Sequence, residues 1–187
     1  TGLNRVLLQV CYLKLLQSHV DKHADLSIAC IEVPRDDASR FGIVGVDENY
    51  GVKSFIEKPS DPPEIPDKPG YSFVNMGIYV FNYQRLVSLL AEDKTWVDFG
   101  REIIPDAIEK YKVQAYLFKH YWEDIGTIRA FYDANLDLAS PLPKFNFFDS
   151  ESPIYTRSRY LPPSKVNSCN VENSMVSEGC ILNGVTA

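Results

Sequence analysis

Short apolar runs alternate with amphipathic stretches along most of the chain, and this alternation restricts the fold more than any other feature. Runs rich in β-branched and aromatic residues, bounded by Gly, Pro, Asn or Asp, predict strands, whereas apolar residues three or four positions apart predict helices. We expect strands at 26–33, 41–46, 52–56, 76–81 and 113–118, and helices at 12–23, 83–90, 100–110 and 127–138. This alternation predicts an α/β layer architecture with a mainly parallel sheet.

Prolines divide the chain into segments. Of the 12 prolines, five fall between Pro59 and Pro69 and five between Pro141 and Pro163. Each proline fixes φ and removes a backbone donor, so the first cluster predicts a loop. The second cluster predicts a linker between two bodies of the protein.

Two six-residue units follow this linker, at Val176–Ile181 and Leu182–Ala187. Each begins with an aliphatic residue and has a small residue, Cys180 or Thr186, four positions on. Repeats of this length are typical of a parallel β-helix, whose coils bury an aliphatic edge only when they stack on neighbouring coils.

Composition excludes several classes of protein. The chain has 187 residues, 45% hydrophobic, which suffices for one domain, or for one domain plus part of another. Its formal net charge of −6 argues against a nucleic-acid binder, which needs a basic patch. No apolar run approaches the roughly 20 residues of a membrane-spanning helix.

Cysteines and histidines indicate neither a metal nor a redox site. The four cysteines contain no CxxC pair, and we expect them to be small buried apolar residues. His19 and His23 are four apart on one helix, but Val20 stands where a metalloprotease helix has Glu. We therefore interpret these histidines as part of a solvated helix face.

The first candidate site is Glu57-Lys58-Pro59, at the end of a predicted strand. Glu57 could accept hydrogen bonds from two adjacent sugar hydroxyls, and Lys58 could pair with a phosphate. Open α/β sheets bind ligands at the carboxyl ends of their strands. The alternative, which the residues alone favour, is a solvated ion pair at a strand end.

Three further positions have a structural alternative of equal or greater weight. Asn75 could read a sugar hydroxyl beside Gly77, or both could belong to an ordinary strand with a glycine bulge. Asp98 could bond a ligand hydroxyl or cap the following helix. Asp124 could hold a hard divalent cation, whereas the alternative is that Asp124 or Thr127 caps a helix.

The order of these motifs resembles one family. The chain contains EKP, a proline-rich loop, NMGIYVF, DFGREIIP, YWEDIGTIRAFYDANLDL, PIYTRSRYLPPSKV and SMVSEGCIL in succession. From about His19 to the end, this succession resembles the ADP-glucose pyrophosphorylases, the glucose-1-phosphate adenylyltransferases of bacterial glycogen and plant starch synthesis. YWEDIGT and LPPSKV are the most specific of these motifs.

The resemblance implies catalytic roles for Lys58 and Asp124. Lys58 would hold the phosphate of glucose 1-phosphate, and Asp124 would help to hold a catalytic Mg²⁺. The other implied substrate-binding residues are Glu57, on the glucose hydroxyls, and Gly42, Asn75, Tyr79, Asp98 and Trp122. Asn75 departs from the family, which usually has Ser there, and Asn is common in related sugar nucleotidyltransferases.

The resemblance also implies a domain organisation. It predicts the later part of a Rossmann-like nucleotidyltransferase domain at 1–140, a linker at 141–163 and the start of a left-handed β-helix at 164–187. It implies ATP, glucose 1-phosphate, ADP-glucose and pyrophosphate as ligands, a homotetramer when full length, and a cytoplasmic location, or a plastid one if the source is a plant. No nucleic-acid or membrane partner is implied.

Two departures concern the start of the chain. Nothing matches the family's glycine-rich ATP loop, and the family's second metal-binding Asp falls at Arg5. A cation cannot replace a Mg²⁺ ligand. We expect a truncated chain, inactive as it stands, with an artefact in its first dozen residues. The alternatives are another hexose-1-phosphate nucleotidyltransferase and a non-catalytic regulatory subunit.

Overall fold

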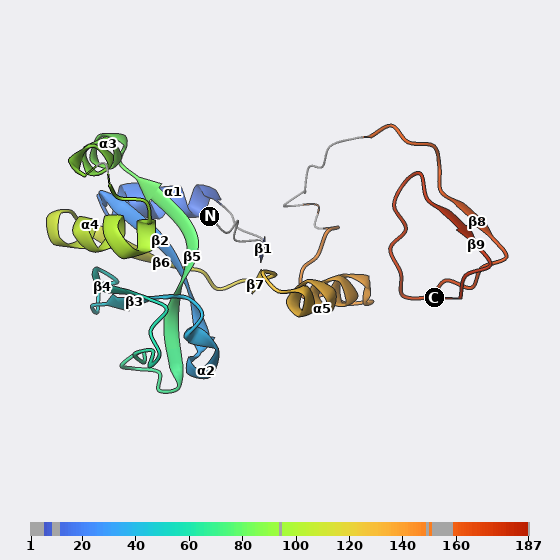
Figure 1. The fold of residues 1–187 in the computed structure, drawn as a ribbon, viewed down its shortest axis with the longest axis horizontal. Coiled ribbons are helices and arrows are strands. Elements are labelled where there is room, and N and C mark those ends of the chain that lie inside the picture. Colours follow the sequence, from blue (N-terminus) through green and yellow to red (C-terminus); the bar gives the residue numbers. More distant parts are fainter. Residues whose placement is uncertain (1–5, 9–11, 94, 149, 151–158, 187) are drawn as a thin grey trace. The chain divides into compact units, whose positions relative to one another are not determined.

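The computed structural model describes residues 6–8, 12–93, 95–148, 150 and 159–186, with backbone only for 6–8 (Figure 1). Arg5, Cys11 and the other residues of the divergent start lie outside this part of the chain, apart from the backbone of 6–8. The structure divides into two units, one formed by 10–120 and the other by 1–9 together with 121–187.

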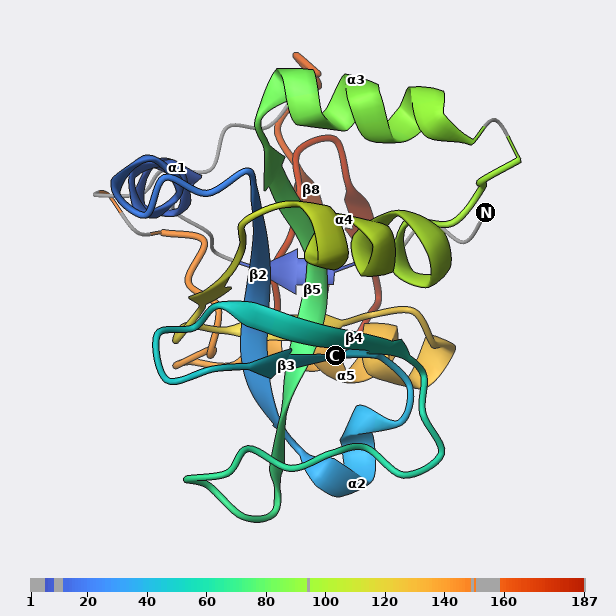
Figure 2. The same cartoon turned by 90° about the vertical axis from the view of Figure 1, so that its left-hand side faces the viewer.

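A five-stranded sheet forms the centre of the 10–120 unit (Figure 2). Its strand order is β4-β3-β5-β2-β6. The strands are β2 (Leu26–Pro34), β3 (Gly42–Val46), β4 (Val52–Glu57), β5 (Tyr71–Phe81) and β6 (Val113–Leu117). Each strand predicted from the sequence is present, and β5 begins five residues earlier than predicted.

The α/β class is confirmed, but the prediction of a mainly parallel sheet is wrong for the described strands. Within this five-stranded sheet, β2 and β6 are the one parallel pair, whereas β2–β5, β3–β4 and β3–β5 are antiparallel. The short turn after Val46, in which Asp47 Oδ1 accepts hydrogen bonds from the amides of Asn49 and Gly51, makes β3 and β4 a hairpin. Tight turns join antiparallel strands, while a parallel pair needs a long crossover, which here contains the helices between β5 and β6.

Helices cover both faces of this sheet. On one face, Ile103, Ile104 and Ala107 pack against Ile28 and Val44, among other buried residues. On the other face, Ala38 packs with Ile43 and Val74. The helical elements of the unit are α1 (Tyr12–Asp21), α2 (Arg35–Ala38), α3 (Tyr83–Glu92), the π-helical turn η1 (Phe99–Ile103) and α4 (Ile104–Lys110). The sequence had indicated η1 and α4 as one helix and had not indicated α2.

Helix α1 packs through a narrower face than its apolar pattern suggests. Leu15 is fully buried, whereas Leu13, Leu16 and Val20 are 73%, 47% and 61% exposed. His19 lies on the buried side, with Nδ1 2.8 Å from Oγ of the buried Ser27. The expectation of a solvated face is therefore correct for the exposed His23 and wrong for His19.

This placement of His19 predicts a pH dependence of stability. Burial lowers the pKa of His19, and the Asp25 carboxylate only partly opposes this effect. Below about pH 6.5, the usual histidine pKa, the unfolded chain binds a proton that the folded state resists. We expect stability to fall as the pH is lowered from 7 to 5, and the loss to be smaller for His19→Gln, as measured by thermal unfolding. His23→Gln is the matched control, and an unchanged pH profile for His19→Gln would contradict the assignment.

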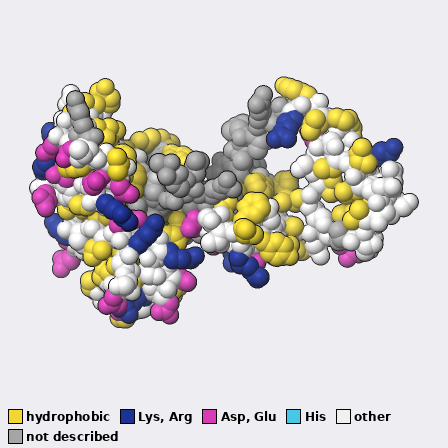
Figure 3. Space-filling model, in the orientation of Figure 1, with side chains coloured by type: hydrophobic (Ala, Val, Ile, Leu, Met, Phe, Trp, Pro, Cys, Tyr) yellow, Lys and Arg dark blue, Asp and Glu magenta, His cyan; other side chains and the backbone are white. Residues whose placement is uncertain are grey.

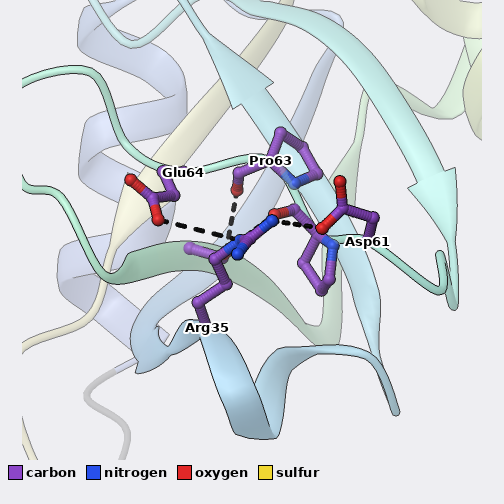
Figure 4. Close-up of polar contacts among 6 residues, drawn as sticks. Arg35, Asp61, Pro63 and Glu64 are labelled. Atoms are coloured by element: carbon purple, nitrogen blue, oxygen red, sulfur yellow. Dashed lines mark hydrogen bonds and ion pairs between the residues drawn. The ribbon is translucent and has the colours of Figure 1, made fainter.

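The proline-rich loop predicted at 59–69 is present and is fixed by Arg35, the first residue of α2 (Figure 4). Arg35 Nε donates to the Pro62 carbonyl at 2.8 Å and lies 3.7 Å from Glu64 Oε1, and Nη2 contacts the Asp61 carboxylate. One guanidinium thus binds three positions of a segment whose prolines leave few backbone donors.

The second unit contains a strand pair, a helix and one β-helix coil. β1 (Val6–Leu8) pairs antiparallel with β7 (Trp122–Asp124). Helix α5 (Ile128–Ala139) confirms the predicted helix, and hydrophobic side chains gather over it in Figure 3. The exposed apolar residues of α5 include Ile128 and Leu136, which are 89% and 55% exposed. No helix among the described residues is both long and apolar enough to cross a membrane.

The coil confirms the parallel β-helix. β8 (Lys165–Asn167) pairs in parallel with β9 (Ile181–Asn183), and Asn167 lies opposite Asn183. Ser168 and Gly184 follow these asparagines with φ of 49° and 64°, so both strands end in the same kind of corner. The structural repeat is thus a whole coil. The first predicted hexad closes this coil and ends at Ile181, the first residue of β9, and the second hexad begins within β9, where the next coil starts.

Candidate functional site

Glu57 is the last residue of β4, and its carboxylate is packed between two glycines. Gly42 lies opposite Glu57 in the β3–β4 register, and Gly100 lies in η1. A Cβ built on either glycine would lie 2.9 Å from Glu57 Oε2, closer than real Cβ atoms approach. The Glu57 side chain is only 22% exposed. Gly42 was predicted to lie against a ligand, and its closeness to Phe55 and Glu57 is a separate reason for glycine there.

Lys58 turns the chain out of β4. Its φ is 49°, in the left-handed region that non-glycine residues seldom occupy. Consecutive strand residues normally point to opposite faces. Here the chain turns immediately after Glu57, and Lys58 Nζ lies 3.7 Å from Glu57 Oε1 while remaining 60% exposed. A cation and a carboxylate therefore sit side by side at the end of β4, as both sequence interpretations require.

Asn75 and Tyr79 flank a bulge in β5. Ile28 pairs with Tyr79 and Cys30 pairs with Asn75, so three residues of β5 oppose one residue of β2. Gly77, at the centre of the bulge, has φ of 74° and donates to Asn75 Oδ1 at 2.9 Å. Asn75 Nδ2 donates to Tyr79 Oη at 2.7 Å. The predicted glycine bulge is confirmed, and the Asn75 amide orients Tyr79.

Tyr79 faces acidic side chains. Burial raises the pKa of its phenol, and the carboxylates of Glu57 and Asp98 raise it further, although the hydrogen bond from Asn75 opposes this shift. The ring stacks on Phe99, with centroids 5.9 Å apart and planes 11° apart. Tyr79 is therefore protonated near neutral pH, and its hydroxyl can still donate a hydrogen bond.

Asp98 caps the helical segment, which was one of its two predicted roles. Its Oδ1 accepts from the amides of Gly100 at 2.8 Å and Arg101 at 3.0 Å. Glu102 returns the contact, because its Oε2 accepts from the amides of Val97 at 2.7 Å and Asp98 at 2.8 Å. This is a reciprocal capping box with one extra residue between its partners.

Trp122 and Asp124 lie in β7, in the other unit. Thr127 Oγ1 accepts from the Ala130 amide at 3.1 Å, so Thr127 is the cap of α5. Asp124 Oδ1 accepts from the Gly126 amide at 3.2 Å in the turn before that cap. The helix therefore needs no capping oxygen from Asp124.

Within the 10–120 unit, the structure brings together the predicted residues of three elements. Glu57 ends β4, Asn75 and Tyr79 belong to β5, and Asp98 precedes η1. Phe99, Gly100 and Glu102 complete this cluster, although the sequence had not assigned them a role. Their signal is the segment Asp98-Phe-Gly-Arg-Glu102, which places a second carboxylate close behind a helix cap.

Comparison with known proteins decides the family. The family described as nucleotidyl transferase matches residues 5–141, most of the chain. The chain belongs to the nucleotidyl transferase family. The GLGC left-handed parallel beta-helix domain matches residues 159–186. These matches and the parallel coil agree with the fold class implied by the resemblance.

Two curated relatives of this nucleotidyl transferase carry the same name. The Glucose-1-phosphate adenylyltransferase of Methylobacillus flagellatus is 40% identical over 92% of this chain and 45% of its own length. The Glucose-1-phosphate adenylyltransferase of Nitrosomonas europaea is 40% identical over 94% of this chain and 45% of its own length. The chain thus spans less than half the length of these relatives.

The donor chemistry of this nucleotidyl transferase fits Mg²⁺ at Asp124. No cluster of three His, Cys, Asp or Glu side chains able to hold a metal occurs in the described part of the chain. Proteins usually bind Mg²⁺ through one or two carboxylates, with substrate phosphates completing the shell. Asp124 is half-buried, and one of its oxygens bonds a neighbouring amide. It therefore suits the role of a single protein ligand.

Proposed function

We propose that this protein transfers AMP from ATP to glucose 1-phosphate, giving ADP-glucose and pyrophosphate. The observation that carries the proposal is the Glu57–Lys58 pair at the end of β4, with Nζ 3.7 Å from Oε1. A carboxylate accepts hydrogen bonds from sugar hydroxyls, and a partly exposed ammonium pairs with a phosphate. The names of the two relatives support the same reaction.

In the proposed reaction, a phosphate oxygen of glucose 1-phosphate attacks the α-phosphorus of ATP. A new P–O bond forms, the bond from the α-phosphorus to the β-bridging oxygen breaks, and pyrophosphate leaves with the electron pair. The protein acts by positioning and by offsetting charge. Lys58 pairs with the sugar phosphate, Glu57 accepts hydrogen bonds from glucose hydroxyls, and the Tyr79 hydroxyl donates toward the bound sugar. Mg²⁺, held by Asp124, would neutralise charge on the phosphates.

We extend the proposal to the predicted assembly and surroundings. Trp122 and Asp98 line the sugar-nucleotide site, the active enzyme is a homotetramer, and the reaction takes place in the cytoplasm, or in a plastid if the source is a plant. We also retain the predicted boundaries, with the catalytic domain at 1–140, the linker at 141–163 and the β-helix at 164–187.

A second candidate is a hexose-1-phosphate nucleotidyltransferase that uses UTP, dTTP or GTP. Asn75 favours it, because adenylyltransferases usually have Ser at this position, whereas Asn is common there in related sugar nucleotidyltransferases. The Asn75 amide donates to Tyr79 Oη at 2.7 Å. The two candidates differ in their nucleotide and share the sugar phosphate.

We expect the 187-residue chain alone to form no ADP-glucose, because it contains no match to the family's ATP loop. A chimera tests the reaction itself: residues 12–187 of this chain replace the matching segment of the Methylobacillus flagellatus relative, which supplies the rest, including the position that Arg5 occupies here. With ATP, glucose 1-phosphate and Mg²⁺, the chimera should form ADP-glucose, and the reaction is measured by the release of pyrophosphate. The unaltered relative is the control. Faster turnover with UTP, dTTP or GTP would establish the second candidate, and synthesis by the chain alone would refute the first expectation.

A further inference from the structure

Gly42 and Gly100 both lie against Glu57 Oε2, but their other neighbours differ. A Cβ on Gly42 would also lie 2.4 Å from Cζ of the Phe55 ring, which cannot easily move aside. A Cβ on Gly100 would meet the carboxylate oxygen first, and the next contacts, Phe55 Cε1 and Asp98 Oδ1, are at 3.2 and 3.4 Å. A methyl group at Gly100 would thus act mainly on the position of the Glu57 carboxylate.

The capping box fixes Gly100 in that place. The carboxylates of Asp98 and Glu102 together accept four backbone amide hydrogens, two on each side of the start of η1. In this π-helical turn, the Ile103 amide also bonds back to the Asp98 carbonyl at 3.4 Å. Isolated π-helical turns are uncommon and often occur at functional sites. The amide of Gly100 is one of the four, so the box sets how closely its Cα approaches Glu57.

We infer that Gly100 and Glu102 are positioning residues for the sugar, and that they act through the Glu57 carboxylate rather than by touching the ligand. This inference rests on the proposed function for its ligand, glucose 1-phosphate. The Glu102 carboxylate completes the capping box, and the box fixes the position of Gly100. Because Gly100 has no Cβ, it leaves room for Oε2 of Glu57. A carboxylate displaced by about 1 Å loses much of its hydrogen bonding to a bound substrate.

Gly100→Ala separates positioning from stability. Gly100 does not have a positive φ, so alanine can adopt its backbone conformation and should not destabilise the chain. We expect the melting temperature to be kept or raised, while the dissociation constant for glucose 1-phosphate, measured by calorimetry on the 187-residue chain, rises roughly tenfold. Glu102→Ala should weaken binding similarly, and Glu102→Gln should restore part of it, because its amide oxygen still accepts. Glu109→Ala, exposed on α4, is the matched control.

A double-mutant cycle in urea unfolding tests the contact without any ligand. Gly100→Ala should be more favourable to stability in a Glu57→Ala background than in the unmodified chain, because Glu57→Ala removes the oxygen that the new Cβ would meet. Strictly additive effects would overturn the inference, as would unchanged sugar-phosphate binding by Gly100→Ala and Glu102→Ala. If the unmodified chain binds no glucose 1-phosphate, the proposed function fails, and the cycle still decides whether Gly100 and Glu102 position Glu57.

Discussion

Asp124→Asn in the chimera should lower turnover by roughly a hundredfold or more, which is the cost of removing one preorganised charge-stabilising group. The two side chains have the same shape, and the asparagine oxygen can still accept from the Gly126 amide, a bond that Asp124 makes at 3.2 Å. Thr127 rather than Asp124 caps α5, so the helix should be unaffected. The substitution therefore removes the anionic oxygen that Mg²⁺ prefers and leaves the turn in place.

The measurement is kcat at saturating ATP and glucose 1-phosphate over a range of Mg²⁺ concentrations. Asp133→Asn is a matched control, because it removes the same charge from the exposed face of α5, where Asp133 pairs with Arg129 at 2.7 Å. Near-normal turnover of Asp124→Asn at ordinary Mg²⁺ would remove Asp124 from the proposed metal site. A loss of activity equal to that of Asp133→Asn would indicate a general effect of charge.

The sequence predicted most elements of the 10–120 unit because their signals are local. β2 reads as one apolar run closed by Pro34, and Asp47 with Gly51 indicates the hairpin turn. Strand direction is not local, and the parallel expectation failed because β3, β4 and β5 follow one another with no helical crossover between them. β7 was missed because three residues that begin with Trp122 and end in two acids carry no strand pattern, and pairing with β1 alone makes them a strand.

The site was predictable in its parts but not in its arrangement. Glu57 and Lys58 stand out because a strand ends in opposite charges. The contact of Gly100 with Glu57 joins residues far apart in the chain, so no spacing could reveal it. Glu102 was not predicted to cap because a capping box usually has its second acid three residues after the first, whereas Glu102 comes four residues after Asp98, a spacing that the π-helical turn accommodates.

Lys58→Ala should weaken glucose 1-phosphate binding roughly ten- to a hundredfold, the value of one hydrogen bond to a charged group, about 1.5–3 kcal/mol. The change should leave the fold intact. Lys58 Nζ is exposed, and its only close described ion pair is with Glu57, at 3.7 Å. Alanine, like lysine, has a Cβ, so the strain of the left-handed backbone at φ 49° is the same for both.

Lys58→Asn separates charge from backbone strain, because asparagine accepts the left-handed conformation more readily than alanine does. If the ammonium charge is what binds the phosphate, both variants should lose affinity equally, whether measured by calorimetry on the chain or as the KM for glucose 1-phosphate in the chimera. The KM for ATP should stay constant in both. Lys53→Ala removes another exposed lysine, which pairs with Asp47 at 3.0 Å, and it should change neither constant. If the ATP constant rose and the sugar-phosphate constant did not, Lys58 would belong to the nucleotide, and the Glu57–Lys58 pair would no longer support the proposed function.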